Sequence, residues 1–454
     1  MEVRHRLMIS ATGSNVGKTT VTMGVMDALM RRGLNLCGFK SGPDYIDPMF
    51  HRKVLGIPSY NLDLFLMGGD YVRSSLARRS AGCDVAILEG AMGFYDGMGT
   101  GSEGSAWDLS QVTETPVLLV VEAAGMGASL AALVSGYANF RENRIIGILI
   151  NQGNPMLKGY YEKILKEHTG LPLLGILPRV EGASISSRHL GLETAEEIQD
   201  LRERIKLLGD AVEEHVDLDL LLELTEVEAM DTPPQGKVAN EEVTMAIARD
   251  RAFSFYYEDS LEALRERGVR LIPFSPLAGE TIPSGVQGVY LGGGYPELHL
   301  EELTKNEKFF GDLRSFYEEG GILLAECGGF MTLLEGFQGE EFHPLAGLLP
   351  GKVSMTSRLQ NFGYTQLTAK RDSLLAGEGE RLRAHEFHYS KAELEGGDFQ
   401  AQKPGREALR TTAYGSHHGY MGYPHIHLAS APQAMERMIQ KMKEWKEEHD
   451  NEGE

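Results

Sequence analysis

Short apolar runs alternate with helical stretches along the first half of the chain. The runs RLMISA, LNLCGF, VAILEG, PVLLVV and IIGILI predict strands, and residues 19–32 predict a helix. Runs that are apolar throughout are typical of parallel strands covered on both faces. Residues 117–138 are apolar over the length of a membrane span, but Glu122 and several glycines interrupt them. We interpret this stretch as a buried strand, a turn and a helix, and the whole pattern as a parallel α/β sheet.

An acidic segment and a polar segment divide the chain. Residues 192–231 are rich in Asp and Glu and predict a solvated pair of amphipathic helices. The segment 231–242, DTPPQGKVANEE, joins a Pro-Pro step to polar and charged residues, a composition typical of interdomain linkers. We therefore expect one domain over residues 1–230, a second over 243–442, and an acidic tail at 443–454.

The α/β alternation restarts after the linker. VTMAIARD, VRLIPFSP, GVYLGGG and GILLAECGG predict strands, and residues 257–268 and 298–319 predict helices. The chain shows no repeat at the periods of solenoid proteins. The predicted fold class is α/β, with two sheet-centred domains.

Composition narrows the classes of function. The 454 residues are 42% hydrophobic and 24% charged, as expected for a globular protein of about two or three domains. The formal net charge is −21, which argues against a nucleic-acid partner because phosphate binding needs a clustered basic surface.

The three cysteines are far apart without CxxC spacing, so neither disulfides nor a zinc knuckle is predicted. MEVRHRLM lacks the apolar core of a signal peptide, and we expect a cytoplasmic protein with no membrane partner.

The segment LMISATGSNVGKTTVTMG places a strand, a glycine-containing turn and a helix start in succession. Backbone N–H groups and the positive end of the helix would hold ATP phosphates there, Lys18 would reach the β- and γ-phosphates, and Thr19 would bind Mg²⁺. The strict GxxxxGK[ST] pattern is not met, since residue 12 is Thr. The alternative is an incidental turn at a helix N-terminus. The predicted nucleotide-binding residues of this loop are Gly13, Asn15, Val16, Gly17, Lys18, Thr19 and Thr20.

Two further segments with acidic residues follow predicted strands. FKSGPDYIDPMF supplies Lys40, Asp44 and Asp47, and VAILEGAMGFYDG supplies Glu89. An α/β sheet presents its ligand groups at the carboxyl ends of its strands, and carboxylates beside bound phosphates suit Mg²⁺. We predict Thr19, Asp44 and Glu89 as magnesium ligands and Lys40 as a nucleotide-binding residue. The alternative is the ordinary polarity of loops.

A cysteine follows an apolar strand in the second half. In GILLAECGGFMTLL, Cys327 lies between a predicted strand and a predicted helix and is followed by two glycines. A strand-to-helix turn exposes a side chain at the sheet edge, and glycines let backbone N–H groups approach an oxyanion. We interpret Cys327 as a nucleophile, and Cys37 and Cys83 as small core residues.

A nucleophilic thiol needs a base, and the segment HHGYMGYPHIHLAS offers four histidines. In a strand-like PHIHLAS, His425 and His427 would share a face. We favour His427 as the base and leave His425 open. Metal binding is the rival interpretation, although no third ligand follows at a regular spacing. RAHEFHYS adds His385 and His388, but it is not HExxH, so a zinc peptidase is not predicted.

Seven motifs taken in order carry a family resemblance. They are the phosphate loop, KSGPDYIDPMF, EGAMGFYDG, LGGGYPELHLEEL, AECGGF, HEFHYS and PHIHLAS. Together they span nearly the whole chain, which resembles the cobyrinic acid a,c-diamide synthase family. The resemblance implies an N-terminal P-loop NTPase synthetase domain similar to dethiobiotin synthetase. It also implies a C-terminal class I glutamine amidotransferase domain of the cobyric-acid-synthase type.

The resemblance implies roles for individual residues. Cys327 looks like the glutaminase nucleophile and His427 like its base. The turn that contains Gly293 and Gly294 looks like the wall of the oxyanion site. In typical class I amidotransferases a glutamate stands two residues after the histidine. Here that position is Ala429, so the third member of the triad is missing.

The implied reaction joins two half-reactions. A thiolate releases ammonia from glutamine, and ATP converts a side-chain carboxylate of a tetrapyrrole into an acyl phosphate that the ammonia aminates. Mg²⁺ is the implied cofactor and ATP a co-substrate. The predicted contacts of the tetrapyrrole are Tyr45, Asp96, His385 and His388.

Two other functions share part of this pattern. Nickel-sirohydrochlorin a,c-diamide synthases perform the same chemistry, and no residue separates their substrate from a corrin. A P-loop switch ATPase of the partition type would use the first half alone and would leave Cys327 without a role. The expected partners are small molecules, namely a tetrapyrrole polycarboxylate, glutamine and ATP. The sequence leaves a homodimer open.

Overall fold

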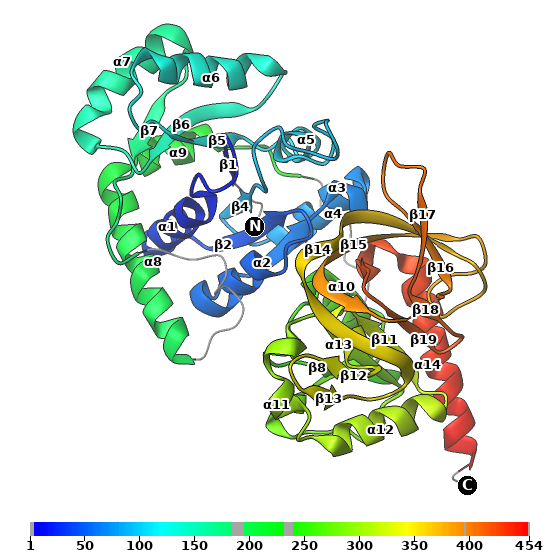
Figure 1. Cartoon of the computed structure of the whole chain (residues 1–454). Helices are drawn as coiled ribbons and strands as arrows, with labels where there is room; N and C mark the ends of the chain where they lie inside the picture. Colours follow the sequence, from blue (N-terminus) through cyan, green and yellow to red (C-terminus); the bar gives the residue numbers. More distant parts are fainter. Residues whose placement is uncertain (1–3, 184–194, 231–238, 395, 453–454) are drawn as a thin grey trace. The chain divides into compact units, whose positions relative to one another are not determined.

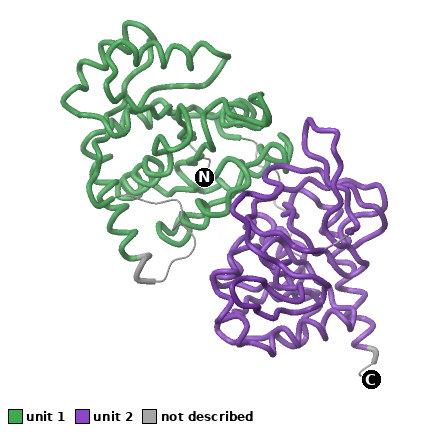
Figure 2. The backbone as a smooth tube through the Cα atoms, in the orientation of Figure 1, with its two compact units in different colours: residues 1–235 green, residues 236–454 purple. Residues whose placement is uncertain are grey.

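The chain forms two compact units, residues 1–235 and 236–454 (Figure 2). The computed structural model describes residues 4–183, 195–230, 239–394 and 396–452 (Figure 1). Most of the expected linker, residues 231–238, lies outside the described residues, as do residues 192–194 of the acidic segment. Each unit contains its own parallel sheet, so the predicted α/β class with two sheet-centred domains is confirmed.

Unit 1 is built on a seven-stranded parallel sheet in the order β3-β2-β4-β1-β5-β6-β7. Its strands are β1 (His5–Ala11), β2 (Leu36–Ser41), β3 (Ser59–Leu62), β4 (Val85–Glu89), β5 (Val117–Glu122), β6 (Ile145–Asn151) and β7 (Leu173–Ile176). The five apolar runs of the sequence correspond to β1, β2, β4, β5 and β6. The two edge strands, β3 and β7, are shorter and were not predicted, because a four-residue strand leaves little periodic signal.

Helices cover both faces of this sheet (Figure 1). They are α1 (Lys18–Arg31), α2 (Ile46–Phe50), the π-helical η1 (His51–Leu55), α3 (Leu64–Met67), α4 (Gly69–Ser80), α5 (Ala106–Val112), α6 (Ala128–Phe140), the 3₁₀-helical η2 (Pro155–Leu157), α7 (Lys158–His168), α8 (Ala195–His215) and α9 (Leu218–Leu224). The apolar stretch 117–138 divides into β5 and α6, and the acidic segment forms α8 and α9, as predicted. In the part of the chain that the structure describes, no helix has the length and apolarity to cross a membrane.

Unit 2 contains a six-stranded sheet in the order β18-β19-β11-β10-β8-β9, parallel except for β18. Its strands are β8 (Val243–Ala248), β9 (Val269–Phe274), β10 (Gly288–Leu291), β11 (Ile322–Glu326), β18 (Tyr414–Gly415) and β19 (Gly419–Gly422). The four predicted runs correspond to β8, β9, β10 and β11. Strands β8, β10 and β11 are buried along most of their length, whereas the edge strand β9 is buried only at its two ends. All four contribute residues to one apolar core.

A second, mostly antiparallel sheet completes unit 2. Its strands are β12 (Leu334–Gln338), β13 (Phe342–Pro344), β14 (Leu349–Ala369), β15 (Arg381–Ala392), β16 (Phe399–Gln402), β17 (Leu409–Thr412) and β20 (His425–Ile426). The sequence did not predict this sheet. The long strand β14 is exposed over much of its length and its pairing with β15 shifts register, so its residues lack a regular apolar alternation.

The helices of unit 2 are α10 (Glu258–Glu266), α11 (Leu300–Leu303), α12 (Glu307–Glu318), α13 (Gly328–Met331) and α14 (Pro432–Glu452), with 3₁₀ turns η3 (Pro276–Ala278), η4 (Pro296–Leu298) and η5 (Leu428–Ser430). The helix expected at 298–319 is divided, because Asn306 caps α12 by accepting from the amide of Phe309. Residues 443–452 of the expected tail continue α14. Trp445 in this part packs beside Phe316, with ring centroids 6.0 Å apart, so the helix is held to unit 2.

Candidate active site

The phosphate loop connects β1 to α1. Gly17 precedes the helix with a φ of 87°, a left-handed conformation that favours glycine. A Cβ atom at this residue would also lie 2.2 Å from Nδ2 of Asn151, which donates to the carbonyl of Val16 at 3.0 Å. The Lys18 ammonium folds back over the loop and donates to the carbonyl of Gly13 at 2.8 Å. The loop therefore has the left-handed turn and the lysine placement of a phosphate cradle.

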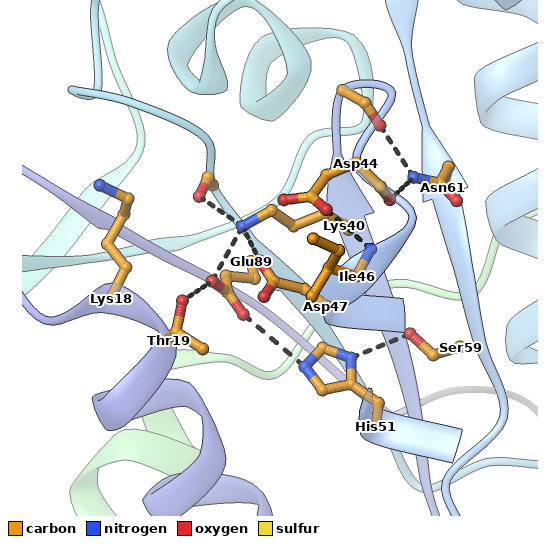
Figure 3. Close-up of polar contacts among 12 residues, drawn as sticks. Lys18, Thr19, Lys40, Asp44, Ile46, Asp47, His51, Ser59, Asn61 and Glu89 are labelled. Carbon is orange, nitrogen blue, oxygen red and sulfur yellow. Dashed lines mark hydrogen bonds and ion pairs between the residues drawn. The ribbon is translucent and has the colours of Figure 1, made fainter. Parts of the chain in front are cut away.

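One buried carboxylate lies beside the phosphate loop. The Thr19 hydroxyl donates to Oε1 of Glu89 at 2.7 Å, and the Lys40 ammonium donates to the same oxygen at 2.9 Å (Figure 3). Lys40 also pairs with Oδ2 of Asp47 at 2.5 Å. Strand β4 lies between β1 and β2, and all three are parallel, so their carboxyl ends bring these side chains together.

The charges in this cluster are strongly coupled because all of them are buried. Burial disfavours the Glu89 carboxylate, but Lys40 and the hydrogen bonds from His51 and Thr19 lower its pKa below the usual range. Burial also disfavours the Lys40 ammonium, yet Asp47 and Glu89 raise its pKa above the usual range. Burial and the charge of Glu89 raise the pKa of Asp47. The pKa of Lys18 is lowered to about 8, first by burial and then by Lys40.

Two oxygen ligands that suit Mg²⁺ lie in contact here, the Thr19 hydroxyl and the Glu89 carboxylate. Asp44, the third predicted ligand, lies in the turn before α2, where its Oδ1 accepts from the amide of Ile46 at 2.8 Å. In the part of the chain that the structure describes, no three His, Cys, Asp or Glu side chains are clustered to hold a metal by themselves. Bound Mg²⁺ would therefore complete its shell with phosphate oxygens, which is its usual mode.

Sequence reasoning missed one residue of this site. His51, the first residue of η1, places Nε2 3.6 Å from Oε2 of Glu89, and its Nδ1 lies 2.9 Å from the Ser59 hydroxyl (Figure 3). It is fully buried. Its position directly after the acidic segment KSGPDYIDPMF was the one signal that could have drawn attention to it.

The predicted substrate residues of unit 1 lie around the same loops. Asp96 accepts from the amide of Gly93 at 2.9 Å and acts electrostatically on Lys18. Tyr45 precedes α2 and is half-buried. The structure therefore brings Asp96 toward the phosphate loop and leaves Tyr45 at the start of a neighbouring helix.

The thiol site of unit 2 is a strained turn. Cys327 lies between β11 and α13 with a φ of 49° and a ψ of −105°, an unfavourable conformation for a residue with a Cβ. Its amide donates to the carbonyl of Gly422, at the end of β19, at 2.8 Å. The same strand-turn-helix arrangement presents nucleophiles in other enzymes. The side chain is 6% exposed, so it is not part of the open surface.

The structure brings His425, not His427, to the thiol. The side chains of His425 and Cys327 are hydrogen-bonded, and Nδ1 of His425 lies 3.7 Å from Oε2 of Glu326. Burial alone would lower the pKa of His425, but the contacts with Cys327 and Glu326 raise it to about 10. This ring can therefore carry the proton of the thiol.

His427 occupies a different environment. It caps η5, where its Nδ1 accepts from the amide of Ser430 at 3.2 Å. The centroid of its ring lies 5.0 Å from the ring centroid of Tyr257. Burial lowers its pKa to about 3. The expectation that His425 and His427 share a face is wrong, because β20 ends at Ile426 and strand alternation does not continue to residue 427.

Glycines allow the backbone to approach this site. A Cβ atom on Gly293 would lie 2.6 Å from Cε1 of His425. A Cβ atom on Gly328 would lie 3.0 Å from the amide nitrogen of Gly294. The predicted glycine turn is therefore next to both the imidazole and the residue that follows the thiol.

Comparisons with known proteins agree with this division of the chain. The CobQ/CobB/MinD/ParA nucleotide binding domain family matches residues 7–192, and the CobB/CobQ-like glutamine amidotransferase domain family matches residues 244–432. Three similar proteins are cobyrinate a,c-diamide synthases. The one from Listeria monocytogenes serotype 4b is 37% identical over 93% of this chain and 96% of its own length. The protein from Caldanaerobacter subterraneus is 35% identical over 96% of this chain and 97% of its own length. The protein from Priestia megaterium is 37% identical over 98% of this chain and 98% of its own length.

The chain belongs to the cobyrinate a,c-diamide synthase family. The suspected resemblance is thereby confirmed, as are the P-loop and amidotransferase domains. Members of this family are ATP-dependent amidoligases, and so is this chain. A partition-type switch ATPase does not account for the amidotransferase domain that fills residues 244–432.

The remaining predicted substrate residues of this family member are buried in the second sheet of unit 2. His388 stacks on Tyr423 at 3.7 Å between ring centroids, and its Nδ1 lies 2.8 Å from the carbonyl of Ser390. His385 pairs with His425 across β15 and β20, and burial lowers its pKa to about 3. The two residues are 6% and 8% exposed, which favours packing roles over contact with a large substrate.

Proposed function

We propose that the chain amidates the a and c acetate side chains of cobyrinic acid, with ammonia taken from glutamine and with ATP as the activating co-substrate. The observation that carries this proposal is the contact of Cys327 with His425 on a strained turn, in a chain that also contains a phosphate loop. A thiol site alone would support a glutaminase, and a phosphate loop alone an ATPase. Their presence in one chain supports a ligase.

The thiol site supplies the nitrogen. The Cys327 thiol gives its proton to His425, and the sulfur attacks the side-chain amide carbon of glutamine. The glycine turn at Gly293 and Gly294 brings the backbone close to the imidazole, and its amide groups would stabilise the oxyanion. The carbon–nitrogen bond then breaks, the proton of His425 passes to the leaving ammonia, and water hydrolyses the thioester to release glutamate.

The phosphate loop supplies the activation. The loop and Lys18 position ATP, a carboxylate of the substrate attacks the γ-phosphorus, and ADP leaves. Ammonia attacks the carbonyl carbon of the acyl phosphate, and phosphate leaves. Thr19 and Glu89 would hold Mg²⁺, which neutralises negative charge on the phosphates. Lys40 holds the Glu89 carboxylate in place from the side of β2.

The substrate follows from the family. The relatives that match nearly the whole chain are named for cobyrinate, which supports a corrin over a nickel porphinoid. The test is to incubate the purified chain with ATP, Mg²⁺ and glutamine and with either cobyrinic acid or nickel-sirohydrochlorin, and to identify the products by mass spectrometry. We expect mono- and diamides of cobyrinic acid. Amides of nickel-sirohydrochlorin alone would assign the other substrate, and amides of neither compound would contradict the proposal.

A further inference from the structure

The glutamate of the usual triad has no counterpart in its usual position. With His425 as the base, the residue two positions later is His427, which burial keeps neutral by lowering its pKa to about 3. A neutral imidazole cannot stabilise a neighbouring imidazolium as a carboxylate does. If His425 has a carboxylate partner, that partner must come from another element.

Glu326, the last residue of β11, lies on the other side of the ring. Its Oε2 is 3.7 Å from Nδ1 of His425, and its side chain is 1% exposed. The Tyr290 hydroxyl, from β10, donates to Oε2 at 2.8 Å, and the amide of Ile426, from β20, donates to Oε1 at 2.9 Å. Two donors from two strands therefore fix this carboxylate beside the imidazole.

The strained turn explains how two consecutive residues reach one ring. Along a strand, successive side chains point to opposite faces, so Glu326 and the next residue would normally diverge. Cys327 leaves the extended conformation, with a φ of 49°. As a result, the carboxylate and the thiol both contact His425.

His385, a titratable neighbour of His425, does not compete for this role. His385 faces it across the β15–β20 pair, and burial keeps His385 neutral with a pKa of about 3. The acidic groups next to the ring are thus the carboxyl group of Glu326 and the thiol of Cys327. The raised pKa of His425 is consistent with both.

We propose that Glu326 is the positioning residue of the thiol site and replaces the missing triad glutamate. Its carboxylate orients His425 with Nδ1 toward Oε2 and stabilises the imidazolium that forms when the thiol proton moves to the ring. The ring becomes neutral again when that proton leaves with ammonia. The distance of 3.7 Å is that of an ion pair, and such contacts commonly shorten when substrate binds. This inference rests on the proposed glutaminase function of unit 2.

The test compares Glu326→Gln with Glu335→Gln, which changes an exposed glutamate of strand β12 in the second sheet of unit 2. Release of glutamate from glutamine is measured across pH, and urea unfolding followed by Trp445 fluorescence in a Trp107→Phe background reports that unit 2 is folded. We expect Glu326→Gln to lower the glutaminase kcat by about 100-fold with little change in KM for glutamine. The basic limb of its pH profile should move to lower pH by about one unit, because the imidazolium loses a carboxylate partner. Glu335→Gln should match the wild type.

The conservative variant Glu326→Asp distinguishes a positioning role of Glu326 from a role in folding. Glu326→Asp keeps the charge but withdraws it from the ring, so we expect it to recover part of the kcat and most of the pH profile. If unit 2 of Glu326→Gln is unfolded, the kcat and the pH profile of Glu326→Asp decide in its place. A wild-type pH profile in the folded variants would overturn the inference, even with reduced activity, because Glu326 would then only support the backbone of β20. If the wild-type chain releases no glutamate, the proposed function fails instead.

Discussion

The Thr19 hydroxyl donates to Oε1 of Glu89 at 2.7 Å, although 70 residues separate the two in sequence. The contact exists because β1 and β4 are neighbours in a parallel sheet, with Ile9 opposite Glu89. The same oxygen accepts from Lys40, so one carboxylate connects the phosphate loop to the loop after β2 (Figure 3). The predictions for unit 1 follow from this connection.

Replacing Glu89 by Gln should impair the synthetase reaction with either nitrogen source. The change removes a charge that pairs with Lys40 and an oxygen that accepts from Thr19, and we expect a loss of about 100-fold or more in amidation with glutamine or ammonia. Asp44→Asn is the milder comparison, because the side-chain oxygen of asparagine can still accept from the amide of Ile46. Both variants should retain labelling of Cys327 by a reactive glutamine analogue. Loss of that labelling would show that these carboxylates serve folding.

Replacing Lys18 by Ala should abolish amidation with both glutamine and ammonia. Lys18 is the cation of the phosphate loop, and without it the β- and γ-phosphates lose a charge-assisted contact. The control is Lys163→Ala, an exposed lysine of α7. ATP binding is measured by calorimetry together with product formation. Ammonia-dependent amidation at the wild-type rate would contradict the assignment of the loop.

Replacing Cys327 by Ala should abolish amidation with glutamine and spare amidation with ammonia. The thiol is needed to release nitrogen, and free ammonia makes that step unnecessary. The two rates are measured side by side on the same preparation. Loss of both reactions would mean that the cysteine is needed for folding of unit 2.

The two histidines of PHIHLAS should behave differently. We expect His425→Gln to reduce glutamine-dependent amidation by about 1,000-fold, because the thiol loses its base, and to spare the reaction with ammonia. His427→Gln, a change of a buried imidazole only two residues away, should retain glutaminase activity within about tenfold while lowering thermal stability. The reverse ranking of glutaminase rates would restore His427 as the base.

Acid should destabilise unit 2 through its buried neutral histidines. The pKa values of His385 and His427 are lowered to about 3, so below pH 6.5 the unfolded chain binds more protons than the folded one. Stability therefore falls as the pH drops from about 6.5 toward 3, by about 1.4 kcal/mol per pH unit for each histidine at most. The pKa of His425 is raised instead, so its contribution is complete below pH 6.5 and is lost as the pH rises toward 10.

Urea unfolding at pH 7 and pH 5 checks this expectation. The chain has two tryptophans, Trp107 in unit 1 and Trp445 in unit 2, so a Trp107→Phe background lets fluorescence report on unit 2. His427→Gln in that background should show a shallower loss of stability between the two pH values. If the free energy of unfolding falls as much between pH 7 and pH 5 in this variant as in its parent, the imidazole of His427 does not cause this pH dependence.

Features contained within about a dozen consecutive residues were readable from the sequence. The apolar runs identified the central strands of both parallel sheets, and the strand-turn-helix patterns identified Lys18, Thr19 and Cys327 as candidates. Such patterns are local, because the conformation of a turn and the start of a helix depend on neighbouring residues. The antiparallel sheet of unit 2 escaped this reasoning, since β14 is largely exposed and carries no regular alternation.

Pairings between distant segments needed the tertiary structure. Asp47, not Asp44, pairs with Lys40, because Asp47 is buried within α2 whereas Asp44 lies in the preceding turn and accepts from the amide of Ile46. His425 faces Cys327 because β20 pairs with β15 in one particular register and ends one residue later. Residue types and short spacings constrain only the nearby chain, whereas the packing of sheets sets which side chains meet across tens or hundreds of residues.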